Sequence, residues 1–247
     1  MGGPERVFDG WHSSRLESRV GFARWGHWGQ PVLVFPTAGG DAGEIERMGL
    51  IDALAPLLGA GRIKVYSCDS VAGVALARRE GSPEHRCWLF KQFGEYVAHE
   101  ALPAIRADCG GAEVTPIVAG ASIGAFNALG VLCRYPHLFR AAIGMSGTYA
   151  LERLLGHPGN VDYHLAAPLR FLPDHPEGEA LERLRTRFAV LAHGQGRWED
   201  PGESWRMADA LGARGIPNRV DTWGPDDDHD WPTWRRMLPL YLDELTE

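Results

Sequence analysis

Ser122 is the residue whose neighbours in the sequence most favour nucleophilic chemistry. It is the centre of the run Gly-Ala-Ser-Ile-Gly (120–124), which joins the strand-like PIVAG to the helix-like IGAFNALGVLCRYP. A Gly-x-Ser-x-Gly run on a sharp strand-to-helix turn lifts the serine hydroxyl out of a sheet edge, and its glycines let the backbones pass without Cβ clashes. The pattern predicts a nucleophile elbow whose serine forms an acyl-enzyme. The alternative is that Ser122 only caps the following helix.

A serine nucleophile needs hydrogen-bond donors for the oxyanion that develops on the substrate. The amide of Ile123, at the start of a helix, is one predicted donor. The second is expected in Thr37-Ala38-Gly39-Gly40, which follows the apolar run PVLVF; the sequence leaves open whether Ala38 or Gly39 donates. A plain glycine turn is the alternative. A phosphate-binding loop is disfavoured because no Gly-Lys-Ser/Thr follows.

A base and an acid are expected downstream of the nucleophile, the acid after a late strand and the histidine after the last one. His229 follows the strand-like NRVDTWGP and precedes the C-terminal helix, so it is the predicted base; the alternative is a surface histidine. Glu199 and Asp200 follow the strand-like RFAVLAHGQG, and either one is a candidate acid. Glu199 is preferred because Asp200 precedes Pro201, where it is placed to cap a helix.

The acidic stretch PDDDHDWPTW (225–234) resembles a metal site in composition. It lacks companion ligands at metal spacing, such as an HExxH motif or a histidine pair four residues apart, so a metal-dependent enzyme is the weaker hypothesis and no metal or cofactor is expected. We interpret Asp226, Asp227 and Asp228 as a solvated loop. Asp230 is interpreted as the N-cap of a helix that begins with WPTW. Trp231 and Trp234 are expected to pack that helix, and the alternative is that they line the substrate pocket.

Strand-like and helix-like segments alternate along the chain, which predicts an α/β fold with a doubly wound, mostly parallel sheet in one domain over residues 1–247. A hairpin or strand is expected over 14–26, and the other expected strands are 31–40, 62–69, 115–122, 140–147, 187–196 and 218–225. One helix is expected from Glu44 to about Gly59, a polar loop before 85, and a long helix bent before Pro103. The segment 149–186 is longer than a crossover requires and is expected to form a cap over the carboxyl edge of the sheet.

Composition narrows the possible partners. A net charge of −7 and a pI near 5.8 disfavour nucleic acid or an anionic membrane, because both bind basic surfaces. No apolar run approaches the ~18 residues that span a bilayer, and no secretory signal is visible. The four cysteines lack a CxxC pair and are expected to be reduced thiols in a cytoplasmic protein. The oligomeric state is not assigned.

Four segments together resemble the "Putative esterase" branch of the α/β-hydrolases, related to the esterase D and antigen 85 mycolyltransferase groups. They are GASIGAFNAL, FPTAGGD, IGMSGTY and HDWPTW. The resemblance covers the chain from about residue 30 onward. It implies the α/β-hydrolase fold and a serine carboxylic-ester hydrolase acting on a small-molecule ester. The implied catalytic triad is Ser122, His229 and Glu199 or Asp200, with an oxyanion hole near Ala38 and Ile123. The alternatives are an acyltransferase with the same triad and a catalytically silent binding module.

Overall fold

The computed structural model describes residues 5–156 and 160–246 and contains one eight-stranded sheet in the order β1-β2-β4-β3-β5-β6-β7-β8. The strands are β1 (Arg6–Ser13), β2 (Ser18–Trp25), β3 (Gln30–Phe35), β4 (Ile63–Cys68), β5 (Ile117–Ala121), β6 (Ala141–Met145), β7 (Phe188–His193) and β8 (Asn218–Thr222). β1 and β2 form an antiparallel hairpin and β2 pairs antiparallel with β4, while all remaining pairs are parallel. The predicted mostly parallel α/β sheet is therefore confirmed, and its hairpin begins earlier than expected, at Arg6.

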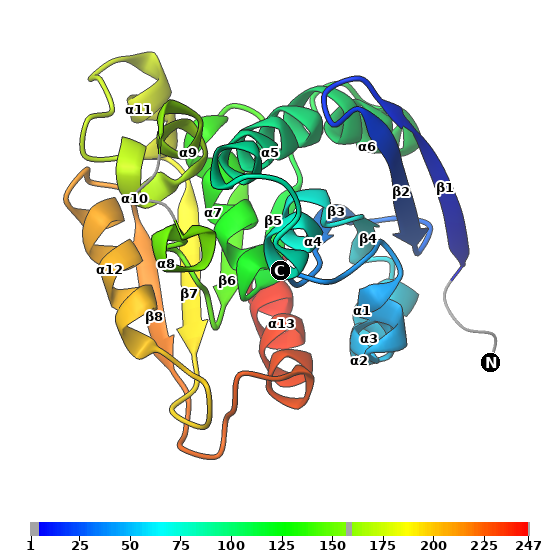
Figure 1. The fold of residues 1–247 in the computed structure, drawn as a ribbon. Coiled ribbons are helices and arrows are strands. Elements are labelled where there is room, and N and C mark those ends of the chain that lie inside the picture. The colour runs from blue at the N-terminus through cyan, green and yellow to red at the C-terminus, as the bar shows by residue number, and fades with distance from the viewer. Residues whose placement is uncertain (1–4, 157–159, 247) are drawn as a thin grey trace.

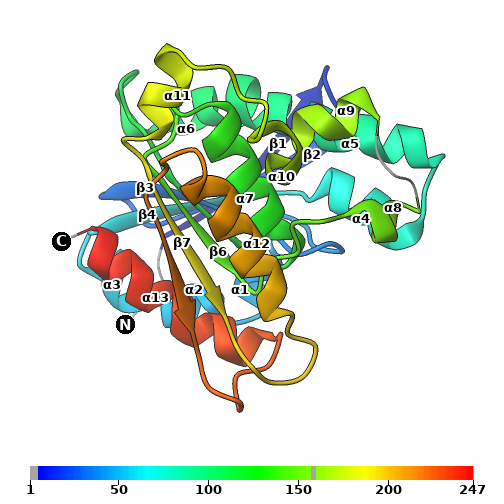
Figure 2. The same ribbon diagram turned by 90° about the vertical axis from the view of Figure 1, so that its left-hand side faces the viewer.

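Helices cover both faces of the sheet (Figures 1 and 2). They are α1 (Glu44–Arg47), α2 (Leu50–Ala53), α3 (Ala55–Gly59), α4 (Val71–Arg78), α5 (Pro83–Tyr96), the π-helical turn η1 (Val97–Ala101), α6 (Leu102–Cys109), α7 (Ile123–Arg134), α8 (Glu152–Leu155), α9 (Val161–Ala166), α10 (Pro168–Phe171), α11 (Glu179–Leu184), α12 (Pro201–Gly212) and α13 (Trp231–Leu245). One apolar core lies between the sheet and α1–α3 with α13, and a larger one lies between the sheet and α5–α7 with α12.

The central strands are continuous apolar runs because both of their faces are buried. Every residue of β4, β5 and β6 is buried, whereas β8 at the sheet edge is only half-buried. Their carboxyl ends meet at one edge, the lower one in Figure 1 for β6, β7 and β8. The loops that follow β5 to β8 therefore come together, and these loops carry the predicted site residues.

One predicted helix and one predicted loop differ from the structure. The segment from Glu44 to Gly59 is three short helices. Gly49 adopts a left-handed conformation (φ 75°) between α1 and α2 and so separates the first helix from the second. The stretch expected as a polar loop contains α4, whose buried face is made of small residues that gave a weak helical pattern. The long helix expected here is continuous through η1, a π-helical turn that ends just before Pro103.

The insertion between β6 and β7 contains α8 to α11, and its residues 157–159 lie outside the described part of the chain. α9 packs on α5, and α10 packs on α7 and α12. Glu179 and Arg183 of α11 border a hollow together with Pro136 and His137. This hollow lies beyond the C-terminal end of α7, whereas Ser122 lies at the N-terminal end of that helix. Within the described residues, α8 is the element of the insertion that borders the hollow at Ser122. The insertion therefore lies mainly on the helix layer rather than over the carboxyl edge of the sheet.

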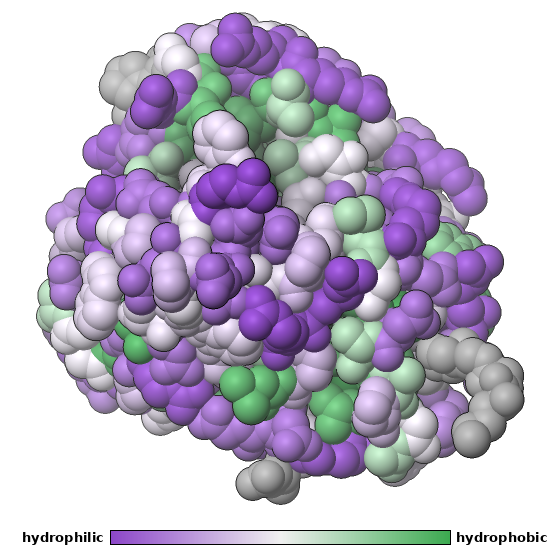
Figure 3. All heavy atoms as spheres, turned by 90° about the horizontal axis from the view of Figure 1, so that it is seen from below, coloured by the Kyte–Doolittle hydropathy of each residue, from purple (hydrophilic) through white to green (hydrophobic). Residues whose placement is uncertain are grey.

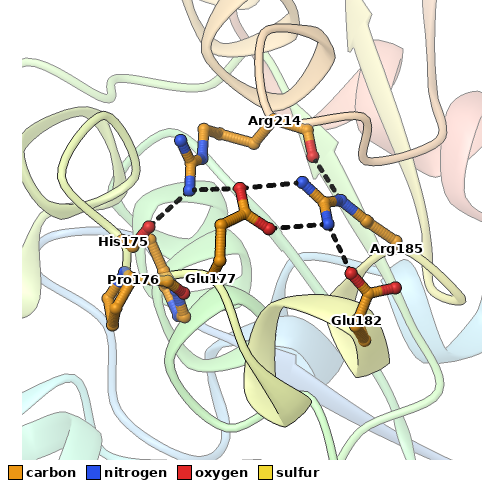
Figure 4. Close-up of polar contacts among 6 residues, drawn as sticks. All are labelled: His175, Pro176, Glu177, Glu182, Arg185 and Arg214. Carbon is orange, nitrogen blue, oxygen red and sulfur yellow. Dashed lines mark hydrogen bonds and ion pairs between the residues drawn. The ribbon is translucent and has the colours of Figure 1, made fainter.

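A polar network anchors the insertion to the turn after α12 (Figure 4). The Arg185 guanidinium donates to the carboxylates of Glu177 and Glu182 and to the carbonyl of Arg214, the last across 2.9 Å. Arg214 in turn donates to the carbonyl of His175 and pairs with Glu177. Because these groups come from both segments, the network fixes α11 against the end of α12.

The described helices include none that is long and apolar enough to cross a membrane. The four cysteines are free, and Cys68, Cys87 and Cys133 are buried. Burial raises the pKa of each of these three thiols.

Candidate active site

Ser122 occupies a sharp turn between β5 and α7. Its backbone is strained (φ 57°, ψ −121°), and its side chain makes no capping hydrogen bond although it stands at the N-cap position of α7. A Cβ on Gly120 would lie 2.4 Å from the carbonyl carbon of Gly124, and one on Gly124 would lie 2.6 Å from the carbonyl oxygen of Phe35. Both glycines of the motif are therefore required by close backbone approach. The half-exposed Ser122 hydroxyl is left free for chemistry.

The loop after β3 is held by Glu44. The Glu44 carboxylate accepts hydrogen bonds from the amide and the hydroxyl of Thr37, each across 2.7 Å, and Gly40 donates to the Thr37 carbonyl across 3.1 Å. These contacts shape the turn that presents Ala38. In the part of the chain that the structure describes, the amides of Ala38 and Ile123 have no hydrogen-bond partner.

Ala38, Ser122 and Ile123 border one hollow of about 430 Å³, and Gly39 does not. The other lining residues come from α4 and its end (Leu76, Ala77, Arg79), from the loop after β6 (Thr148) and from α8 (Arg153, Leu154). The candidate nucleophile and the two residues whose amides lack partners thus border one hollow. This arrangement favours Ala38 over Gly39 as the second donor.

Glu199 lies in a polar cluster at the ends of β6 and β7. Ser146, just after β6, donates to Glu199 Oε1 across 2.5 Å and accepts from the indole Nε1 of Trp234 across 2.9 Å. Burial raises the pKa of Glu199, the hydrogen bonds from Ser146 and Gly194 oppose this, and the nearby charges of Asp227 and Asp228 add to it. Ser146 itself is buried and has a positive φ of 45°. Glu199 is thus a half-buried carboxyl held in a defined position.

Asp200 has a different environment. It is exposed, and its side chain accepts a hydrogen bond from the amide of Gly202 across 3.0 Å, which makes it the N-cap of α12. The expectation that Asp200 caps the helix is confirmed. Since its carboxylate is used in this way, Glu199 is the better candidate for the acid.

His229 lies in the loop after β8 and is half-buried. Its amide donates to the carbonyl of Arg197 across 3.0 Å, and its ring meets the ring of Trp234 edge-on with centroids 5.3 Å apart. Burial lowers the pKa of His229, and this effect outweighs the opposing charge of Asp230. The imidazole is therefore held in its neutral form at neutral pH, the form that accepts a proton.

Glu199 and His229 follow neighbouring strands, and Ser146 and Trp234 link them. The backbone of Ser122 joins the same region, because it donates to the Met145 carbonyl, the residue before Ser146. Among the contacts of the described residues, no hydrogen bond joins Ser122 to His229 or His229 to Glu199, and His229 does not border the hollow at Ser122. Catalytic hydrogen bonds are often long in unliganded enzymes and shorten when substrate binds.

The acidic stretch before His229 is more ordered than the sequence indicates. Asp227 is buried, accepts from the amide of Gly224 across 2.8 Å and pairs with Arg236. Asp228 pairs with Arg197 across 3.1 Å. The interpretation of a solvated loop is therefore wrong for Asp227, whereas Asp228 is partly exposed and pairs with an exposed arginine.

Two other interpretations of this stretch agree with the structure. The Asp230 side chain accepts from the amide of Thr233 across 3.1 Å, which confirms it as the N-cap of α13. Trp234 is buried, and Trp231 is partly buried against the same core. Among the residues with described placement, no group of three or more His, Cys, Asp or Glu side chains could hold a metal ion.

Hydrophilic side chains dominate the face seen from below, and hydrophobic ones form small separate patches there (Figure 3).

Two features of the site could not be foreseen from the sequence: the contact of Glu44 with Thr37 and the hydrogen bond between Ser146 and Glu199. In the sequence, Glu44 is an ordinary acidic residue in the first turn of a helix. Its hydrogen bonds to Thr37 form only because the chain turns between the two residues. The positive φ of Ser146 is visible only in three dimensions. The GMSG run around it was a weak signal of a tight turn.

The family described as "Putative esterase" matches residues 59–243, more than half of the chain. A search of curated proteins finds no match. Three solved structures are similar over nearly the whole length of both chains. A ferulic acid esterase is 15% identical with a TM-score of 0.73, and the match covers 99% of each chain. FphF, a fluorophosphonate-binding serine hydrolase of Staphylococcus aureus, is 12% identical with a TM-score of 0.74, covering 100% of each chain. An S-formylglutathione hydrolase of Agrobacterium tumefaciens is 13% identical with a TM-score of 0.72, covering 98% of this chain and 94% of the other.

Proposed function

Since the chain belongs to the "Putative esterase" family and has the α/β-hydrolase fold, we propose that it is a serine hydrolase that cleaves carboxylic esters of small molecules through an acyl-enzyme on Ser122. His229 is the general base, Glu199 is the acid that orients it, and the amides of Ala38 and Ile123 form the oxyanion hole. The observation that carries this assignment is the free Ser122 hydroxyl on a strained turn, beside two unpartnered amides in one hollow.

In the acylation step, Ser122 Oγ attacks the ester carbonyl carbon while His229 takes the hydroxyl proton. The carbonyl oxygen becomes an oxyanion that accepts hydrogen bonds from Ala38 and Ile123. Collapse of this tetrahedral intermediate breaks the bond to the alkoxy oxygen, and the imidazolium of His229 gives its proton to that oxygen. An alcohol leaves, and the acyl group stays on Ser122.

Deacylation repeats the chemistry with water as the nucleophile. His229 takes a proton from water, and the hydroxide oxygen attacks the acyl carbon to form a second oxyanion in the same hole. Its collapse breaks the bond to Ser122 Oγ, which receives the proton from His229, and a carboxylic acid leaves. The buried, neutral imidazole is suited to both proton transfers, and Glu199 stabilises the imidazolium that forms between them.

The test is active-site labelling combined with turnover of 4-nitrophenyl acetate. The wild type should react with a fluorophosphonate probe at one site, which peptide mass spectrometry should locate at Ser122. Ser122→Ala should lose both labelling and turnover while its thermal unfolding stays unchanged. Ser146→Ala changes the other serine that follows a strand end with positive φ, and it should still be labelled at Ser122, although more slowly. Labelling that persists in Ser122→Ala would overturn the assignment.

The four free cysteines support a cytoplasmic location, since such thiols persist in a reducing compartment. Fractionation of cells that express the full-length protein tests this: the protein should be recovered with the cytoplasmic fraction, and recovery from the extracellular fraction would contradict it.

A further inference from the structure

The hollow at Ser122 has an unusual charge. Among residues 5–156 and 160–246, its lining includes two arginines, Arg79 at the end of α4 and Arg153 in α8, and no acidic residue. The protein as a whole carries a net charge of −7, so a local excess of positive charge beside the nucleophile runs against its general composition. A positively lined hollow raises the local concentration of anions.

Both arginines are exposed, and their charges are available to a ligand. Within the described residues, neither Arg79 nor Arg153 has an ion-pair or hydrogen-bond partner for its guanidinium. The acids next to them in sequence are used elsewhere, because Glu80 pairs with Arg78 across 3.6 Å and Glu152 pairs with Arg170. The two guanidinium groups at the hollow thus have no carboxylate partner among the described residues, while Arg78 and Arg170 are each paired with one.

The backbone at Arg79 supplies a second observation. Arg79 follows the last turn of α4 in the left-handed conformation (φ 55°, ψ 37°), where glycine is the usual residue. A side chain in this conformation is strained, and strain of this kind concentrates at binding sites. The side chain of Arg79 therefore occupies a position that folding alone would give to glycine.

We propose that the esters cleaved at this site carry an anionic group, a carboxylate or a phosphate, which Arg79 and Arg153 bind beside Ser122. This assignment rests on the function proposed above and adds the substrate class. A guanidinium donates paired hydrogen bonds that match the oxygens of either anion. Leu76 and Leu154 line the same hollow, so the anionic group is expected on a partly apolar substrate.

The test compares two esters that differ only in charge. The monoanion 4-nitrophenyl hydrogen adipate and its neutral methyl ester share acyl length and leaving group. A second pair, 4-acetoxybenzoate and its methyl ester, places the anion on the alcohol side. The measured quantity is the ratio of kcat/KM for the anionic ester to that for the neutral ester, compared between wild type and variants so that intrinsic reactivity cancels.

The variants are Arg79→Gly, Arg153→Gln and the double variant. Each single change should lower the ratio by about two- to fivefold for at least one pair, as expected for exposed ion pairs, and the double variant should lower it further. The turnover of the neutral esters should change little. Arg79→Gly should unfold no earlier than the wild type on heating, because glycine relieves the left-handed strain. Arg78→Gln is the matched control, since Arg78 lies on the same helix outside the hollow, and its ratio should equal that of the wild type.

Ratios that stay unchanged in the double variant for both pairs would overturn the anion site while leaving the esterase proposal intact. If instead the wild type hydrolyses no ester and is not labelled at Ser122, the esterase proposal fails, and the anion site is judged by binding alone. Disodium adipate should then raise the Tm of the wild type above that in sodium chloride of equal ionic strength. The double variant should lose this rise, and an equal rise in both proteins would overturn the site.

Discussion

The hydroxyl of Ser146 donates a 2.5 Å hydrogen bond to the carboxylate of Glu199 and links the ends of two neighbouring parallel strands. The same hydroxyl accepts from Trp234, whose ring also packs against His229. The Ser146 side chain therefore contacts the proposed acid, Glu199, directly and is linked to the proposed base, His229, through Trp234. We infer that Ser146 is a positioning residue for this pair.

Replacement of Ser146 should disturb the pH dependence of catalysis as well as its rate. The hydrogen bond from Ser146 lowers the pKa of Glu199, so its loss should raise that pKa further. Because Glu199 must be ionised to support the imidazolium, the acidic limb of kcat/KM should move to higher pH. We expect Ser146→Gly to show this shift with about a tenfold loss of kcat/KM. Glycine accepts the positive φ, so Tm should fall only slightly; an unchanged pH profile would contradict the positioning role.

The choice between the two adjacent acids gives a second prediction. Glu199→Gln keeps the shape of the side chain but removes the charge that stabilises the His229 imidazolium, so kcat should fall by about 10²- to 10⁴-fold. Asp200→Ala removes the N-cap of α12 and should lower the free energy of unfolding by about 1 kcal/mol, with kcat unchanged within about twofold. Steady-state kinetics and urea unfolding of both variants separate the roles. A large fall in kcat for Asp200→Ala with little change in kcat for Glu199→Gln would instead make Asp200 the acid.

The depressed pKa of His229 predicts the position of the acidic limb. A histidine base works only when neutral, and burial lowers the pKa of His229 below its usual value of about 6.5, so kcat/KM should stay near its maximum as pH falls to about that value. Asp230 acts in the opposite direction and raises the pKa of His229. Asp230→Asn retains an N-cap residue for α13 and should move the limb to lower pH. A limb that moves to higher pH in this variant would contradict His229 as the base.

The buried strands and the elbow could be predicted because their signals are local. Continuous apolar runs identify buried strands, and the Gly120 and Gly124 pair reports a close backbone approach that the structure shows directly. The same locality explains the N-caps at Asp200 and Asp230, whose partners lie two or three residues away.

The remaining features depend on tertiary contacts that no local pattern encodes. Asp227 looked solvated because its partner Arg236 lies one element further along, in α13. Gly194 could not be recognised as a contact point, although a Cβ there would lie 1.8 Å from the carbonyl oxygen of Asp227. α4 was missed because alanine and glycine on its buried face give little amphipathic contrast. The conformations of the loops that complete the site thus depend on contacts between separate elements of the chain, which no local pattern reveals.

The glycines of the elbow give the last prediction, which concerns stability. A Cβ added to Gly124 would lie 2.6 Å from the Phe35 carbonyl oxygen and 2.9 Å from that of Pro36, both rigid backbone atoms. Gly124→Ala must therefore push α7 away from β3 and should lower the free energy of unfolding by about 1–3 kcal/mol. It should also lower kcat, because the same movement displaces the Ile123 amide from the proposed oxyanion hole.

Gly59→Ala is the matched control for this change. Gly59 is exposed at the end of α3 with nothing within 4 Å of an added Cβ, and alanine is the better helix former. Its free energy of unfolding should stay equal or rise by up to about 1 kcal/mol, with kcat unchanged. Urea denaturation of both variants provides the measurement. If Gly124→Ala were as stable as the wild type, the elbow would accommodate a methyl group at this position. The close approach of α7 to β3 would then not explain the second glycine of the motif.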